Sequence, residues 1–251
     1  MTPLTIATLF PRDTVAAGDE ANAMALVRRA RQRGMQATHT AVNRPEAMTP
    51  AQLYLLGGDG LAGVADLVAH LRSTNMAEEV RSGQAMIFAV DAGLAAVGRS
   101  WTDANGSVHE GLGLVGSTAL ATSPWVASVV TRAAPRLGLP AMIGWYSHSF
   151  AVTRDKHVDQ LAELVADPAG GRDLDGVITP GVIGTHLHGP VLALNPELAD
   201  LVLAQAVGAS GWDPLPVPSA QAARARRIAE LRSRPPHAPR RRTIRGLLQR
   251  G

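Results

Sequence analysis

Short apolar runs alternate with amphipathic segments along the first ninety residues or so of the chain. An apolar run bounded by turn residues predicts a buried strand, and apolar positions that recur roughly every 3.6 residues predict a helix. By these criteria strands are expected over 4–10, 35–42, 51–60 and 85–90, and helices over 18–34 and 61–72. Because strands alternate with helices, the pattern predicts an α/β domain whose mostly parallel central sheet carries helices on both faces.

The pattern is less regular in the second half of the chain. The segments GLGLVGSTALATS and LPAMIGWYSHSFAVTR predict a mixed or antiparallel group of strands. The clearest helix follows in NPELADLVLAQAVG. There Asn195 is a favourable N-cap, Pro196 suits the first helical position and Gly208 follows the end.

The end of the chain differs from the rest in composition. It is rich in proline, alanine and arginine, which predicts a domain over 1–210 and a tail over 211–251, with a short helix around 219–232. Residues 221–251 hold ten arginines and one acid, a net charge of +9, so the other 220 residues sum to −6. We expect 233–251 to be mobile and dispensable for folding. Arginine outnumbers lysine 23 to 1, which indicates compositional bias and does not favour nucleic-acid binding.

Composition narrows the class of protein. A chain of 251 residues that is 46% hydrophobic and 18% charged can bury a sizeable core. The absence of cysteine excludes disulfides, thiolate metal sites and a cysteine nucleophile. The first residues, MTPLTIATLF, lack the basic segment and long apolar stretch of a signal peptide, and no run of 18 apolar residues predicts a membrane span. We therefore expect a cytoplasmic protein.

Four glycine-containing loops follow predicted strands, where open parallel sheets bind ligands. They are LLGGDG (55–60), AVDAG (89–93), GWYSHS (144–149) and IGTHLHGP (183–190). The second has the layout of a nucleophile elbow, a tight strand-to-helix turn, and it presents Asp91. The fourth loop is the most specific indication of a functional site, because two histidines between a glycine and a proline are unusual for residues that only pack in a core.

Other interpretations of these residues stay open. Asp91 could cap the helix that it precedes, or act as a nucleophile as in dehalogenase-type hydrolases. His186 and His188 could form a metal pair, but we expect the two side chains to point to opposite faces, which disfavours a metal site. His148 fits a structural hydrogen-bonding role better than a catalytic one. No cofactor is expected.

The loops, taken in order, resemble those of a known family. The motifs that carry the resemblance are GDEAN, RRARQRG, LLGGDG, AVDAG, GLGL, GWYSHS and GTHLHGPVLALNPELAD, and they span roughly residues 4–208. They resemble class I glutamine amidotransferases of the cobyric acid synthase type, and are most similar to GatD, the glutaminase subunit of lipid II isoglutaminyl synthase. The last motif is close to the family's GTYLHGP, followed by Asn-Pro and a helix. The resemblance implies a three-layer domain of the class I glutamine amidotransferase type.

The resemblance also implies a mechanism. In the family a cysteine at the elbow attacks the side-chain amide of glutamine, a histidine acts as base and acid, and backbone amides stabilise the oxyanion. Ammonia then passes to a partner enzyme, which for the GatD type is a Mur-ligase-like (MurT-type) subunit. By motif match the nucleophile position is Asp91, the base position is His188, and the substrate- and oxyanion-binding positions are Gly57, Gly58, Ala92 and His148.

The chain departs from the family pattern at the residues that carry the chemistry. The elbow cysteine is Asp91, and the family's GGGQD is GGDGL here, without the glutamine-contacting Gln. The family's GFENHSGRT is GWYSHSFAV, which loses Asn and Arg. No acidic residue stands two positions after His188, so the third member of a triad is unassigned.

Two hypotheses about function follow. A carboxylate is a far weaker nucleophile toward an amide than a thiolate, and losing a triad nucleophile costs on the order of 10⁴ to 10⁶ in turnover. The first hypothesis is a GatD-like pseudo-amidotransferase that binds a partner or ligand without hydrolysing glutamine. The second is a working subunit that supplies ammonia for amidation of the peptidoglycan precursor lipid II. Under the first, Asp91 and His188 are expected to form an ion pair with an oxygen–nitrogen separation within roughly 4 Å.

Overall fold

A computed structural model describes residues 3–10, 19–58, 60–61, 63–164 and 174–233. The strands are β1 (Leu4–Leu9), β2 (Ala37–Val42), β3 (Leu53–Leu56), β4 (Met86–Val90), β5 (Ser100–Thr102), β6 (Val108–Glu110), β7 (Ser117–Ala133), β8 (Met142–Arg154), β9 (Ala162–Leu164), β10 (Leu174–Asp175), β11 (Val177–Ile178), β12 (Val182–Thr185) and β13 (Leu187–His188). The α-helices are α1 (Asp19–Gln32), α2 (Val64–Arg72), α3 (Met76–Arg81), α4 (Ala92–Val97), α5 (Val191–Leu194), α6 (Pro196–Ala206) and α7 (Pro218–Ser233). Two 3-10 turns cover Pro45–Ala47 and Pro135–Leu137.

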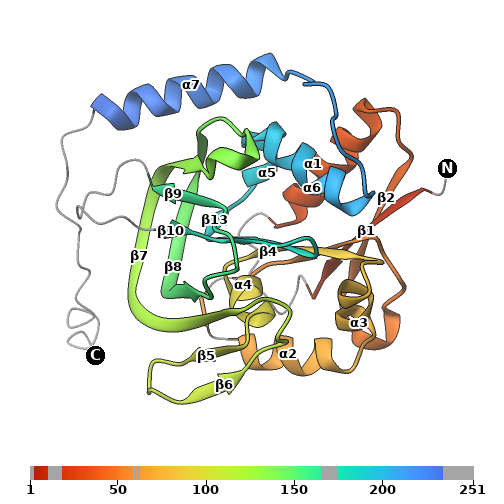
Figure 1. The fold of residues 1–251 in the computed structure, drawn as a ribbon, viewed down its shortest axis with the longest axis vertical. Coiled ribbons are helices and arrows are strands. Elements are labelled where there is room, and N and C mark those ends of the chain that lie inside the picture. Colours follow the sequence, from red (N-terminus) through yellow and green to blue (C-terminus); the bar gives the residue numbers. More distant parts are fainter. Residues whose placement is uncertain (1–2, 11–18, 59, 62, 165–173, 234–251) are drawn as a thin grey trace, which may run out of the picture.

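The central sheet has the order β11-β12-β4-β3-β1-β2. Each of these strands runs parallel to its neighbours except β11, which is antiparallel to β12. Helices α2, α3 and α4 cover one face, and α1, α5 and α6 cover the other (Figure 1). The predicted α/β class with a mostly parallel sheet between two helical layers is therefore confirmed.

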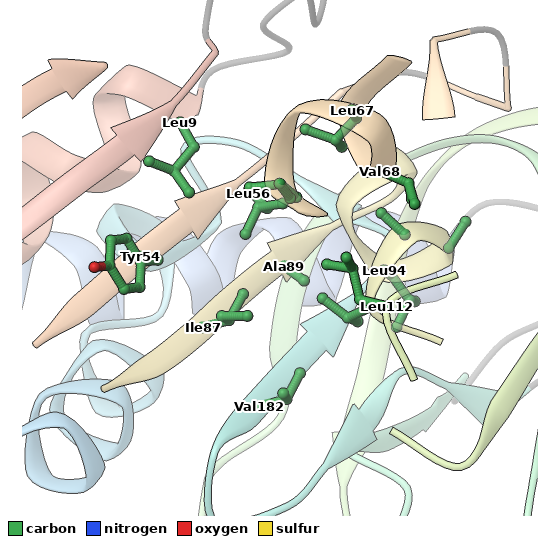
Figure 2. Packing of buried hydrophobic residues seen from close by; sticks show 14 of the residues in the cluster. Leu9, Tyr54, Leu56, Leu67, Val68, Ile87, Ala89, Leu94, Leu112 and Val182 are labelled. Carbon is green, nitrogen blue, oxygen red and sulfur yellow. The ribbon is translucent and has the colours of Figure 1, made fainter. Parts of the chain in front are cut away.

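Successive residues of the central strands face opposite helical layers, as the strand period requires. On β3, Tyr54 and Leu56 contact the cluster that contains α2 and α4, whereas Leu53 and Leu55 join the cluster that contains α1 and α6. Figure 2 shows the first cluster, with Leu67 of α2 among the residues that cover the strands. Burial on both faces explains why these strands appear in the sequence as continuous apolar runs.

A second sheet packs beside the first and is built on a long antiparallel pair. Strand β7 pairs with β8 along most of its length, with an irregularity between Ala121 and Trp125. The sheet order is β10-β9-β7-β5-β6, and β8 lies between β7 and β13. The antiparallel section expected in the second half of the chain is confirmed.

The helix predicted around 219–232 is present as α7, and it lies against the domain. The Arg224 guanidinium donates to both carboxylate oxygens of Glu197 on α6, at 2.6 and 2.8 Å. Upstream of α7, the guanidinium of Arg33 lies over the ring of Trp212, with its Cζ 4.6 Å from the ring centroid. The division into a domain over 1–210 and a tail stays a prediction, and residues 234–251, for which disorder is expected, lie outside the described residues.

Replacing Arg224 by alanine is expected to lower the free energy of unfolding by about 1–2 kcal/mol, because it breaks a largely buried bidentate pair. Arg224 is 7% exposed. Arg226→Ala on the same helix is the matched control, since that side chain is 78% exposed and lies 3.9 Å from Glu230. Urea unfolding of both variants checks the prediction, and equal losses would contradict it.

In the described part of the chain, no helix combines the length and the apolar character that crossing a membrane requires.

Candidate functional site

The predicted elbow is formed where β4 ends and α4 begins. Asp91 has φ 46° and ψ −103°, a conformation that costs a non-glycine residue on the order of 1–3 kcal/mol. Backbone bonds fix the turn, because Asp91 N–H donates to Thr185 O at 3.0 Å and Ala95 N–H donates to Asp91 O at 3.1 Å. A Cβ on Gly93 would lie 2.4 Å from the carbonyl oxygen of Leu56, so only glycine allows this approach of helix to strand.

The Asp91 side chain turns into the protein and is fully buried. Its Oδ2 accepts the backbone N–H of Gly60 at 2.5 Å, and its Oδ1 lies 3.0 Å from Nδ1 of His186. The expectation that the side chain caps α4 is wrong: Asp91 stands at the N-cap position but makes no side-chain cap bond. The glycine loop and His186 bind the carboxylate instead.

Both histidines of the HLH segment face Asp91. Besides the His186 contact, Nε2 of His188 lies 3.9 Å from Asp91 Oδ2, within the separation expected for that pair. The prediction that His186 and His188 point to opposite faces is wrong, because residues two apart on an extended segment share a face. In the described ranges, no group of three or more His, Asp or Glu side chains is arranged to hold a metal ion.

His188 is held in a form that does not suit a base at the elbow. Its Nε2 lies 2.9 Å from the carbonyl oxygen of Ser147, which can only accept, so Nε2 carries a proton. In a neutral His188 the lone pair is then on Nδ1, on the far side of the ring from Asp91. Nδ1 is buried and has no hydrogen-bond partner among the described residues. No carboxylate in that part of the chain therefore takes the place of the unassigned third triad member.

Two of the predicted oxyanion positions, Gly58 and Ala92, bond to each other. Ala92 N–H donates to Gly58 O, at a long 3.5 Å. Gly57, which precedes Gly58, is buried. Gly60 was not predicted as a site residue, yet it supplies the N–H that binds Asp91. A backbone donor has no side-chain signature, so only its place in the GGDG turn indicated it.

His148 lies beside His186. Its Nδ1 donates to Phe150 O at 2.9 Å, and its ring lies 4.6 Å from that of His186 between centroids. Phe150 also contacts the ring of His186, with centroids 4.7 Å apart. These residues share one face of β8, and they form an aromatic wall around His186.

Asp175 is a further member of the site that no sequence signal indicated. It is fully buried and accepts the Thr185 hydroxyl at 2.5 Å and the His186 N–H at 2.9 Å. Burial raises the pKa of Asp175 against these hydrogen bonds and the His186 ring, which lower it. Burial also lowers the pKa of His186 to about 4, although the Asp175 carboxyl acts in the opposite direction. At neutral pH His186 is therefore uncharged.

The solved structures that are similar to this chain include a glutamine amidotransferase and a glutaminase domain. One, a crystal structure of a glutamine amidotransferase, has a TM-score of 0.56 at 15% identity, over 80% of this chain and 98% of that chain. The other, the glutaminase domain of Trypanosoma brucei CTPS with bound acivicin, has a TM-score of 0.55 at 13% identity, over 84% of this chain and 96% of that chain.

The chain has a class I glutamine amidotransferase-like fold. No protein-family model and no curated protein sequence matches it. At 15% and 13% identity the similarity shows the fold alone, so the roles of Asp91 and His188 stay predictions.

Within this amidotransferase-like fold the site has a defined chemistry. An ionised Asp91 can only accept, so a neutral His186 holds its proton on Nδ1. Both carboxylate oxygens are then occupied by donors, one from Gly60 and one from His186. In this arrangement both oxygens of the elbow carboxylate are engaged in hydrogen bonds.

Proposed function

We propose that the protein is a GatD-like pseudo-amidotransferase, a subunit that binds a partner or ligand without hydrolysing glutamine. The observation that carries the proposal is the buried carboxylate of Asp91, held by the Gly60 N–H and the His186 ring. This carboxylate stands where the resemblance implies a cysteine.

Each requirement of amide hydrolysis is affected. The nucleophile is a carboxylate whose oxygens are engaged. The base position, His188, carries its proton on the nitrogen nearest Asp91. An anion beside the glycine loop repels the negative charge that a tetrahedral intermediate develops, and it takes up a loop N–H that could stabilise that charge.

For the partner we propose a Mur-ligase-like subunit of the MurT type, acting on peptidoglycan precursors. The support is the order of the motifs over 4–208, which is most similar to that of the GatD type. The most specific of these motifs is GTHLHGPVLALNPELAD. Part of that motif is structural in this chain. Asn195 makes no side-chain cap for α6, but its amide bonds both the N–H and the carbonyl of Ile143 on β8, at 3.0 and 2.8 Å.

The purified protein is expected to release no ammonia from glutamine above a buffer control, because it lacks a competent nucleophile and base. A coupled ammonia assay on the wild type and on His188→Ala measures this. Steady release by the wild type that His188→Ala abolishes would refute the proposal. As a corollary, Asp91→Cys is expected to restore little activity, because the Gln and Arg positions of the family's glutamine pocket are also changed; substantial release by this variant would show that the pocket has been kept.

A further inference from the structure

A cavity apart from the elbow lies where α1, α5, α6 and the start of α7 meet. It has a volume of about 340 Å³. Its polar lining comes from Arg28, Arg29 and Gln32 on α1 and from Ser219 on α7. None of these residues belongs to the group around Asp91, so the cavity is independent of the proposed function.

Arg29 lines this cavity, and part of its guanidinium has no acceptor among the described residues. The residue is 3% exposed; its Nε and Nη2 donate to the two carboxylate oxygens of Asp200 at 2.7 and 2.5 Å, and Nη2 also donates to Leu215 O at 2.5 Å. Its Nη1 is buried and has no hydrogen-bond partner among the described residues. A buried donor without an acceptor costs about 1–3 kcal/mol, and more when it is charged. This group therefore needs an acceptor that the described residues do not provide.

The surroundings of Arg29 favour an anion. Asp200 is shared, because Arg33 donates to the same two oxygens at 2.8 and 2.6 Å. Asp200 thus serves two guanidiniums, and Asp213 adds a second negative charge near Arg33, so the excess positive charge at the cavity comes from Arg28. Arg28, one residue before Arg29, is exposed at the rim of the cavity and adds a third cation.

The first turn of α7 adds backbone donors. The first N–H groups of a helix have no intrahelical acceptor, and the helix dipole places partial positive charge there. In α7 the bond from Gln221 N–H to Val217 O, at 3.0 Å, closes the first turn. Ser219 and Ala220 precede Gln221 and both line the cavity. A helix N-terminus beside arginine is a favourable site for a phosphate group.

We infer that this cavity binds the phosphate monoester of a small organic molecule. The Arg28 guanidinium, the Nη1 of Arg29 and the first N–H groups of α7 are several donors, and they match the several oxygens of a phosphoryl group better than the two of a carboxylate. The remaining walls, which include Leu192, Pro196 and Val217, are apolar and suit the organic part. The volume also exceeds what an inorganic phosphate ion needs.

Calorimetric titration of the full chain with phenyl phosphate, inorganic phosphate and benzoate tests the inference. We expect phenyl phosphate to bind more tightly than inorganic phosphate, and benzoate to bind most weakly. Arg28→Gln should weaken phenyl phosphate binding about tenfold, which corresponds to about 1.4 kcal/mol. Arg31→Gln is the matched control: it removes the same charge from the same helix but does not line the cavity, and it should change binding by less than about twofold.

Arg29→Lys addresses the buried group directly. It keeps the cation near Asp200 but loses the guanidinium fork, so we expect binding at least about tenfold weaker. Should this variant fold poorly, the comparison of Arg28→Gln with Arg31→Gln decides the question by itself. No binding of either phosphate at millimolar concentration, tighter binding of benzoate, or equal effects of Arg28→Gln and Arg31→Gln would overturn the inference.

Discussion

Replacing Gly93 by alanine is expected to lower the free energy of unfolding by about 3 kcal/mol or more. The new methyl group would lie 2.4 Å from the carbonyl oxygen of Leu56 and 2.8 Å from its carbonyl carbon. A flexible side chain could rotate away from such a contact, but these are backbone atoms of β3. The helix that follows the elbow must therefore move away from the sheet, and the positions of Asp91 and Ala92 change with it.

Gly34→Ala provides the control for this prediction. Gly34 has φ +77°, and a Cβ there meets nothing within 4 Å. Its substitution adds backbone strain without a clash and should cost about 1 kcal/mol. Urea unfolding of both variants makes the comparison, and a loss for Gly93→Ala no larger than that for Gly34→Ala would show that α4 moves at little cost.

Acidification is expected to destabilise the protein through His186 by up to about 3 kcal/mol. Burial lowers the pKa of this histidine from 6.5 to about 4. Between these values the unfolded chain binds a proton that the folded protein does not, so stability falls as the pH falls from about 6.5 to about 4 and changes no further below that. Each unit of pKa difference contributes about 1.4 kcal/mol.

The variant His186→Gln isolates this effect, because it keeps a hydrogen-bond donor for Asp91 but does not titrate. The free energy of unfolding should fall more for the wild type than for the variant between about pH 7 and about pH 5. The titratable groups that face His186 are Asp91, Asp175, His188 and His148. Since the pKa of Asp175 is raised, its contribution decreases as pH rises, the opposite trend, and it is present in both proteins. A wild-type advantage that grows on acidification would mean that His186 is charged and paired with Asp91.

Elements with a continuous hydrophobic pattern could be predicted from the sequence. The helix expected over 18–34 is α1 (Asp19–Gln32), and the strand expected over 85–90 is β4 (Met86–Val90). In each of these elements the spacing of the apolar residues determines which side chains are buried. Asn195 shows the limit of such local rules: it precedes α6 as predicted, but its side chain bonds Ile143, which is 52 residues away.

The sequence predicted which residues lie at the candidate site, but it did not predict the contacts that their side chains make. Asp91 and His188 do lie near each other, because both follow strands that end at the same edge of the sheet. The shared orientation of His186 and His188 was predicted wrongly, because residues two apart on an extended segment point to the same face. Burial of Asp175 likewise depends on β10 and β12, which come together only in the folded chain.

The connection from β12 to β13 also affects how the protein unfolds. Residues 182–188 belong to both sheets, and His186 stands between them. Neither sheet can open locally at this point without pulling on the other, so the two are expected to behave there as one cooperative unit. The cluster around Asp91 draws its members from both, from β4 and β12 on one side and from β8 and β13 on the other. Partial unfolding of either sheet therefore takes the whole cluster apart, and no intermediate is expected to keep it.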